Sequence, residues 1–205
     1  MNTWVKVCGL TRPADVEAAI RAGADAVGLV LVTRSVRRID PVQAVNLAAT
    51  ATGRVEVVVL VEGSPESAVA LAKRIGADTV QPYGPAAPAI AEAAMMADLG
   101  ALLPVPVLAN TAIDVSEVPA GARPLLDTAT VAGSGGSGRS FDWGMARGVP
   151  GVVIAGGLNA ENVAQAIALA RPWGVDASSG LEAAAGVKDH GKVAAFVEAA
   201  RSAEE

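Results

Sequence analysis

The sequence is poor in the residues on which several classes of protein depend. It contains one cysteine, one histidine and 3% aromatic residues in a chain of 205 residues. A single cysteine cannot form an internal disulfide, which fits a reducing compartment. The one histidine, His190, opens the last predicted helix, far from the predicted strand ends, and we expect it to be structural or solvent-exposed. Triads that use histidine and metal sites with several histidines are therefore excluded.

Long apolar runs and an excess of positive charge are also absent. No apolar stretch reaches the ~20 residues that span a bilayer, and the N-terminus lacks the basic and apolar segments of a signal peptide. The net charge of −5 argues against a general nucleic-acid or anionic-membrane partner, but it allows a local positive pocket. We therefore expect a cytoplasmic protein with no nucleic-acid or membrane partner.

Short apolar runs alternate with alanine-rich stretches of helical character along the whole chain. Alternating units of this kind predict parallel strands, and eight of them predict a closed (β/α)8 barrel formed by one domain, residues 1–205. The chain is shorter than the ~250 residues typical of that fold, so the barrel must be compact. The predicted strands are 4–8, 26–32, 54–61, 79–81, 105–109, 125–127, 152–155 and 173–177.

Helices are predicted between most of these strands, over 13–22, 41–50, 65–75, 88–96, 143–147, 160–170 and 191–201. Asp40 and Ser64 each precede a proline, which is typical of a helix start, and Asn159 is the expected cap of the helix after strand seven. Residues 110–124 show no helical period and predict a loop. A doubly wound open sheet is the alternative, but the first turn, Cys8-Gly9, is not a glycine-rich dinucleotide motif.

In barrels of this kind, function lies at the carboxyl ends of the strands. The candidate site residues at those ends are Cys8, Arg37, Gln81, Asp127, Gly156, Gly157, Asp176, Ser178, Ser179 and Gly180.

Cys8 and Asp127 suit proton transfer as a pair, a thiolate as base and a protonated carboxyl as acid. A lone cysteine is also often a small buried hydrophobe, so this role depends on its neighbours. The strand period of two places Lys6 on the same face as Cys8. An inward lysine needs a carboxylate partner, and we expect its charge to lower the pKa of Cys8.

Glycine-rich turns after strands seven and eight, Gly156-Gly157 and Ser178 to Gly180, predict a phosphate site, because glycine lets backbone N–H groups approach an anion. Arg34, Arg37 and Arg38 follow strand two and form either a carboxylate or phosphate clamp or a solvated face. Residues 133–138 predict a loop over the site, a second anion nest or a flexible linker.

Several motifs, in order, resemble those of phosphoribosylanthranilate isomerases, the (β/α)8 enzymes of tryptophan biosynthesis. The resemblance covers nearly the whole chain, and the ordered set is highly specific although each motif alone is weak. The motifs are KVCGLT at 6–11, SVR at 35–37, LD at 126–127, GGSG at 135–138, FDW at 141–143, AGGLN at 155–159, GVDASSGLE at 174–182 and GVKD at 186–189.

This resemblance implies an Amadori isomerisation of N-(5-phosphoribosyl)anthranilate, a small phosphorylated aminosugar, without cofactor or metal. We expect a monomer or a homodimer. The resemblance implies Cys8 as general base, Asp127 as general acid and Arg37 as the residue that holds the anthranilate carboxylate. It also implies a phosphate site at the two glycine turns and a barrel that lacks a regular fifth helix. An acid must be neutral to donate, so we expect a raised pKa for Asp127.

The chain departs from the family pattern in two places. The family usually reads Val-Gln-Leu-His-Gly at the end of strand four, where this chain has Val80-Gln81-Pro82-Tyr83-Gly84. The loop after strand two usually begins with phenylalanine and carries a proline, where this chain has residues 31–34, LVTR. A related sugar-phosphate isomerase with paired aspartates, or an inactive phosphate-binding barrel, is the alternative function.

Overall fold

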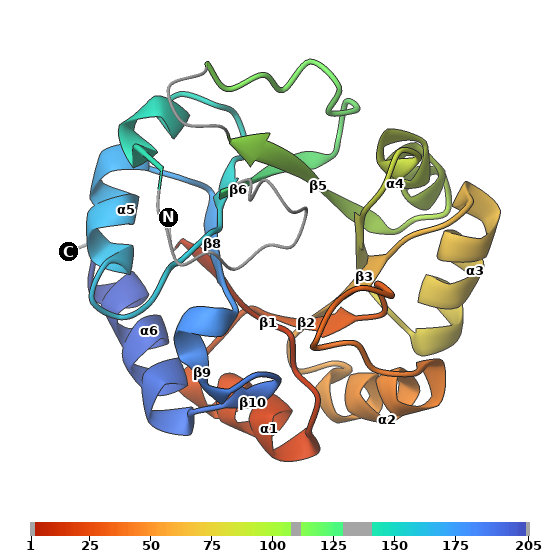
Figure 1. Cartoon of the computed structure of the whole chain (residues 1–205), viewed down its shortest axis with the longest axis horizontal. Helices are drawn as coiled ribbons and strands as arrows, with labels where there is room; N and C mark the ends of the chain where they lie inside the picture. The colour runs from red at the N-terminus through yellow and green to blue at the C-terminus, as the bar shows by residue number, and fades with distance from the viewer. Residues whose placement is uncertain (1–2, 108–111, 129–140, 204–205) are drawn as a thin grey trace.

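The computed structural model describes residues 3–107, 112–128 and 141–203. Eight parallel strands close into a barrel in chain order, the first strand pairs with the last, and helices surround the barrel (Figure 1). The predicted (β/α)8 barrel is confirmed. The strands are β1 Trp4–Cys8, β2 Ala26–Val30, β3 Glu56–Val61, β4 Thr79–Pro82, β5 Gly100–Val107, β6 Arg123–Thr128, β7 Val153–Ile154 and β8 Gly174–Ala177.

The helices begin and end where local chemistry directs. Asp40 accepts a hydrogen bond from the Gln43 N–H, and Ser64 accepts one from the Ser67 N–H, so both predicted caps form. Gly76 ends its helix in the left-handed conformation that glycine favours. The helices of the described residues are α1 Pro13–Ala22, α2 Pro41–Ala51, α3 Pro65–Ile75, α4 Ala87–Met96, α5 Val163–Ala170 and α6 His190–Ser202.

The connection from β5 to β6 contains turns and irregular backbone but no helix in its described part, residues 112–122, as expected for a barrel without a regular fifth helix. Between β6 and β7, the described residues form one short 3-10 helix, η1 (Trp143–Ala146). No helix of the described residues is long and apolar enough to cross a membrane.

The strand period of two divides the core into two layers. Val5 and Val7 point outward into the layer between barrel and helices, whereas Cys8 points inward and packs with Val58 and Leu125. Lys6 also points inward and is fully buried. Burial on both faces explains why the strands read as continuous apolar runs.

Most predicted boundaries agree within two residues, but three predictions need correction. β5 begins at Gly100, five residues before the predicted start. It pairs with β4 only through Gly100 and Ala101, so its two later prolines remove no donor from that ladder. α5 begins at Val163, and its N-cap is Asn162; Asn159 instead caps the preceding turn by accepting the N–H groups of residues 161 and 162.

A two-stranded hairpin near the C-terminus was not predicted. It consists of β9 (Glu182–Ala184) and β10 (Val187–Lys188), which follow η2 (Ser179–Leu181). Gly186 forms its turn with φ +76°. The predicted loop at 133–138 lies outside the described residues.

Candidate active site

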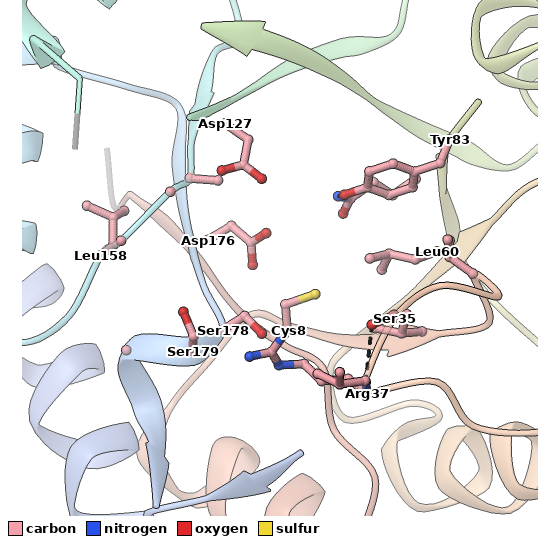
Figure 2. Close-up of a pocket in the computed structure, with 18 of the residues that line it drawn as sticks. Cys8, Ser35, Arg37, Leu60, Tyr83, Asp127, Leu158, Asp176, Ser178 and Ser179 are labelled. Atoms are coloured by element: carbon pink, nitrogen blue, oxygen red, sulfur yellow. Dashed lines mark hydrogen bonds between the residues drawn. The ribbon is translucent and has the colours of Figure 1, made fainter. Parts of the chain in front are cut away.

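A cavity of about 220 Å³ opens at the carboxyl ends of the strands, and Figure 2 shows side chains from both halves of the barrel pointing into it. The structure brings all ten candidate site residues to its wall, together with Tyr83 and an apolar side formed by residues such as Val30 and Leu60. Arg34 also lines it, whereas Arg38 does not. Their chemical roles stay predictions at this point.

Lys6 lies beneath the cavity floor and joins two of these residues. Its Nζ donates to Asp176 Oδ2 at 2.8 Å and to Gln81 Oε1 at 2.9 Å. The expected carboxylate partner of Lys6 is therefore Asp176, and the pair is almost completely buried. The other oxygen of Asp176, Oδ1, is buried without a hydrogen-bond partner in the part of the chain that the structure describes.

Cys8 ends β1 with its side chain almost wholly buried. A Cβ at Gly28 on the neighbouring strand would meet the Cys8 sulfur at 2.7 Å, so glycine at that position makes room for the thiol. Burial raises the pKa of Cys8, and the ammonium of Lys6 opposes this effect without reversing it. The predicted effect of Lys6 is therefore present, but the net pKa of Cys8 is raised because desolvation of the thiolate outweighs the attraction of Lys6.

Asp127 reaches the cavity from β6. Burial, followed by repulsion from the Asp176 carboxylate, raises the pKa of Asp127 to about 6. This is the predicted direction. A carboxyl with this pKa is partly protonated near neutral pH and can donate a proton.

The turns after β7 and β8 place glycine backbone at the cavity wall. Gly156 and Gly157 adopt φ +84° and +71°, in the left-handed region that glycine favours. A Cβ at Gly156 would also lie 2.8 Å from the backbone nitrogen of Thr128, and one at Gly180 would lie 2.2 Å from the Leu158 carbonyl oxygen. At Gly156 and Gly180 these turns leave no room for a side chain, so backbone borders the cavity there.

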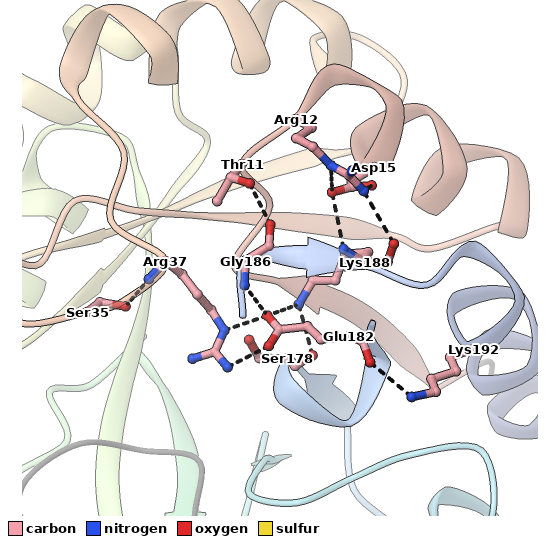
Figure 3. Close-up of polar contacts among 10 residues, drawn as sticks. All are labelled: Thr11, Arg12, Asp15, Ser35, Arg37, Ser178, Glu182, Gly186, Lys188 and Lys192. Atoms are coloured by element: carbon pink, nitrogen blue, oxygen red, sulfur yellow. Dashed lines mark hydrogen bonds and ion pairs between the residues drawn. The ribbon is translucent and has the colours of Figure 1, made fainter. Parts of the chain in front are cut away.

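Arg37 lines the cavity and belongs to a network of polar contacts that was not predicted from the sequence (Figure 3). Its Nε and Nη2 donate to the two carboxylate oxygens of Glu182 at 2.6 and 2.8 Å. Lys188 Nζ donates to Glu182 at 3.1 Å and to the Ser178 carbonyl oxygen at 2.9 Å. Burial acts to raise the pKa of Glu182, but Arg37 and Lys188 outweigh it, and the net pKa is lowered.

His190 lies outside this cavity, as predicted. It begins α6, and its Nε2 lies 2.9 Å from Oδ1 of Asp15 in α1. No group of three or more histidine, cysteine, aspartate or glutamate residues is suitably placed for a metal ion in the described ranges.

Known protein families include one that matches most of this chain. Residues 5–199 match the family model of N-(5'-phosphoribosyl)anthranilate (PRA) isomerase. The chain belongs to this isomerase family. A PRA isomerase of Methylibium petroleiphilum is 41% identical, with 100% of this chain and 96% of the relative covered, and one of Afipia carboxidovorans is 40% identical, with 99% and 91% covered.

Solved structures of the PRA isomerase family share the fold. The enzyme of Thermotoga maritima is 32% identical, with a TM-score of 0.85 over 98% of this chain and 99% of that chain. A PRA isomerase in complex with reduced 1-(o-carboxyphenylamino)-1-deoxyribulose 5-phosphate has a TM-score of 0.80 and 29% identity, with 98% and 99% covered.

Glu182 and Lys188 lie within two of the motifs that carry the resemblance, but neither was predicted as a site residue. Glu182 contacts Arg37 across 145 positions of sequence, so the pair has no local signal. Tyr83 was noted only as a departure. The structure places its hydroxyl where it accepts a hydrogen bond of 2.7 Å from Gln81 Nε2.

Proposed function

We propose that this chain converts N-(5-phosphoribosyl)anthranilate to 1-(2-carboxyphenylamino)-1-deoxyribulose 5-phosphate, a step of tryptophan biosynthesis. The observation that carries the proposal is the single cavity into which Cys8 from β1 and Asp127 from β6 both open, beside the glycine turns and Arg37. Family membership supports the same reaction.

The substrate is anchored at its two anionic ends. The turns at Gly156-Gly157 and at Ser178 to Gly180 hold the phosphate through backbone N–H groups. Arg37 binds the anthranilate carboxylate, because guanidinium pairs strongly with planar carboxylates. Asp176 Oδ1, which has no hydrogen-bond partner in the described part of the chain, accepts a hydrogen bond from a substrate hydroxyl, and Gln81 completes the floor.

Asp127 performs the first proton transfer. Its protonated carboxyl donates to the furanose ring oxygen while the C1–O bond breaks. The nitrogen lone pair forms a C1=N bond, and the open chain is a protonated Schiff base. The raised pKa of Asp127, about 6, keeps part of the population in the donating form.

Cys8 performs the second transfer. As a thiolate, it removes the C2 proton, the C–H electrons form a C1=C2 bond, and the C1=N electrons return to nitrogen. The resulting enolamine becomes the ketone when the C2 hydroxyl loses its proton and C1 gains one. The buried charge of Lys6 stabilises the thiolate, although burial still keeps the net pKa of Cys8 raised.

The test is the loss of substrate fluorescence when the protein is added. The wild-type chain should remove the signal, and Cys8→Ala and Asp127→Asn should each slow the loss by ~10²–10⁴, the usual share of general acid–base catalysis. A near-native rate in either variant would refute these roles. An inactive wild-type chain that still bound phosphate would favour the binding-barrel alternative.

Three further properties belong to this proposal. We place residues 1–205 in one barrel domain, in the cytoplasm, as a monomer or a homodimer. One solved relative, from Thermotoga maritima, is described as mutually generated monomers of a dimeric enzyme. Sedimentation analysis would measure the mass in solution, and cell fractionation would test the location.

A further inference from the structure

The carboxylate of Glu182 is the centre of a polar cluster next to the cavity (Figure 3). It accepts hydrogen bonds from Arg37, from Lys188 Nζ and, at 3.3 Å, from the Gly186 N–H. The side chains of Glu182 and Lys188 are 7% and 0% exposed, and that of Arg37 is 16% exposed. Nearly complete burial makes these contacts stronger than those of a surface ion pair.

Glu182 occupies one edge of the Arg37 guanidinium and leaves the other edge available. Nε and Nη2 both point at the carboxylate, whereas Nη1 has no partner among the residues that the structure describes. Arg37 also lines the cavity. The chain approaches it closely at Gly9, where a Cβ would lie 2.5 Å from Arg37 Cδ and 2.9 Å from the Ser178 hydroxyl.

A negative charge beside an anion-binding arginine weakens its attraction for an anion. Arg37 and Lys188 carry two positive charges and Glu182 one negative charge, so the cluster retains a net charge of +1. Glu182 therefore reduces the electrostatic attraction, and any benefit to binding must come from the geometry that it imposes. A fixed, bidentate fork loses less entropy when it pairs with a carboxylate.

We propose that Glu182 is a positioning residue, which holds Arg37 so that its remaining edge faces the carboxylate of the substrate's aryl group. Lys188 ties the same cluster to the Ser178 carbonyl, at the turn that forms the phosphate site. The hairpin β9–β10 thus fixes the distance between the two anionic ends of the substrate. This inference rests on the proposed function.

The alternative is that the ion pair only fastens the hairpin to the barrel. To separate the two, dissociation constants are measured by calorimetry for two ligands: reduced 1-(2-carboxyphenylamino)-1-deoxyribulose 5-phosphate and its phenylamino counterpart without the carboxyl. The proteins are the wild type, Glu182→Gln, Arg37→Ala and the double variant. Glu198→Gln, an exposed charge change on α6, is the matched control.

If Glu182 positions Arg37, Glu182→Gln should raise the dissociation constant of the carboxylated ligand by about tenfold, which corresponds to one hydrogen bond to a charged group. It predicts a change below about twofold for the phenylamino ligand and for Glu198→Gln, and no further loss when Glu182→Gln is added to Arg37→Ala.

An equal loss of affinity for both ligands, or a loss of affinity from Glu182→Gln that persists in the Arg37→Ala background, would show a merely structural role and overturn the inference. Tighter binding of both ligands in Glu182→Gln would overturn it too, because charge alone would then dominate. Failure of the wild type to bind the carboxylated ligand would instead refute the proposed function.

Discussion

The pH dependence of catalysis follows from the two raised pKa values in the cavity. Asp127 must be protonated to act as acid, and it loses its proton above about pH 6. Cys8 must be ionised to act as base, and burial places its pKa above the ordinary value of about 8.5. Between pH 6 and the pKa of Cys8, the active form therefore needs the less populated protonation state of each group: protonated Asp127 and ionised Cys8.

The magnitude follows from the gap between the two groups. Because the pKa of Cys8 lies well above that of Asp127, only a small minority of molecules has the proton on Asp127 and the charge on Cys8 at any pH. The population of this form rises tenfold per unit below pH 6 and then stays constant up to the pKa of Cys8. We therefore expect log kcat/KM to rise to about pH 6 and to show a plateau above it.

Asp127→Asn is the variant that tests this assignment, with initial rates measured by substrate fluorescence from pH 5 to pH 10. The variant should be ~10²–10⁴ slower, and its rate should continue to rise with pH, because only Cys8 titrates. The substrate phosphate also titrates near pH 6, but its contribution remains in the variant. A rate that stops rising above pH 6 in Asp127→Asn, or a wild-type rate that falls between pH 6 and pH 8, would refute the reasoning.

The remaining predictions concern the supporting residues. Lys6→Met should leave Asp176 buried without its partner, lower the stability by about 3–5 kcal/mol in urea unfolding and raise the pKa of Cys8 in thiol titration. Gly156→Ala should lower the free energy of unfolding by about 1–2 kcal/mol, because alanine is strained in the left-handed backbone conformation. It should also reduce phosphate affinity, because its Cβ would meet Thr128 and Asp127. Tyr83→Phe should cost about 1–3 kcal/mol in urea unfolding by leaving the Gln81 amide without its partner.

Each of these has its own control or contradicting result. An unchanged Cys8 pKa in Lys6→Met would show that the two groups are not coupled. Gly148→Ala has a similar φ of +86° with nothing within 4 Å of the new Cβ, so it should match Gly156→Ala in strain but leave phosphate affinity intact. Wild-type stability in Tyr83→Phe would mean that the Gln81 amide finds another partner.

The barrel could be predicted from sequence because its signals are local. Apolar runs, Asp40 and Ser64 as caps and Gly76 as a helix end each act within a few residues, and their alternation implies parallel strands. The prediction of β5 failed because two prolines and a leading glycine are poor strand signals, and the strand is sustained mainly by its pairing with β6. The predicted start of α5 was wrong because Asn159 and Asn162 both resemble caps, and only the backbone path decides between them.

The site could be predicted in part for a similar reason. The rule that barrels place function at the strand ends, together with the period of two, located Cys8, Asp127 and the inward Lys6. The sign of the Cys8 pKa shift could not be obtained in this way, because it depends on how completely the fold excludes water. The Glu182–Arg37 pair was missed since it joins distant segments through a hairpin with weak sequence signals.

The central claim is that Cys8 and Asp127 act on neighbouring atoms of one bound substrate. A crystal structure of this chain with reduced 1-(2-carboxyphenylamino)-1-deoxyribulose 5-phosphate tests it most directly. We predict the Cys8 sulfur within about 3–3.5 Å of C2, the Asp127 carboxyl at the hydroxyl formed from the ring oxygen, and the phosphate on the glycine turns. A ligand whose C2 faces another base, or whose phosphate lies away from both turns, would contradict the account.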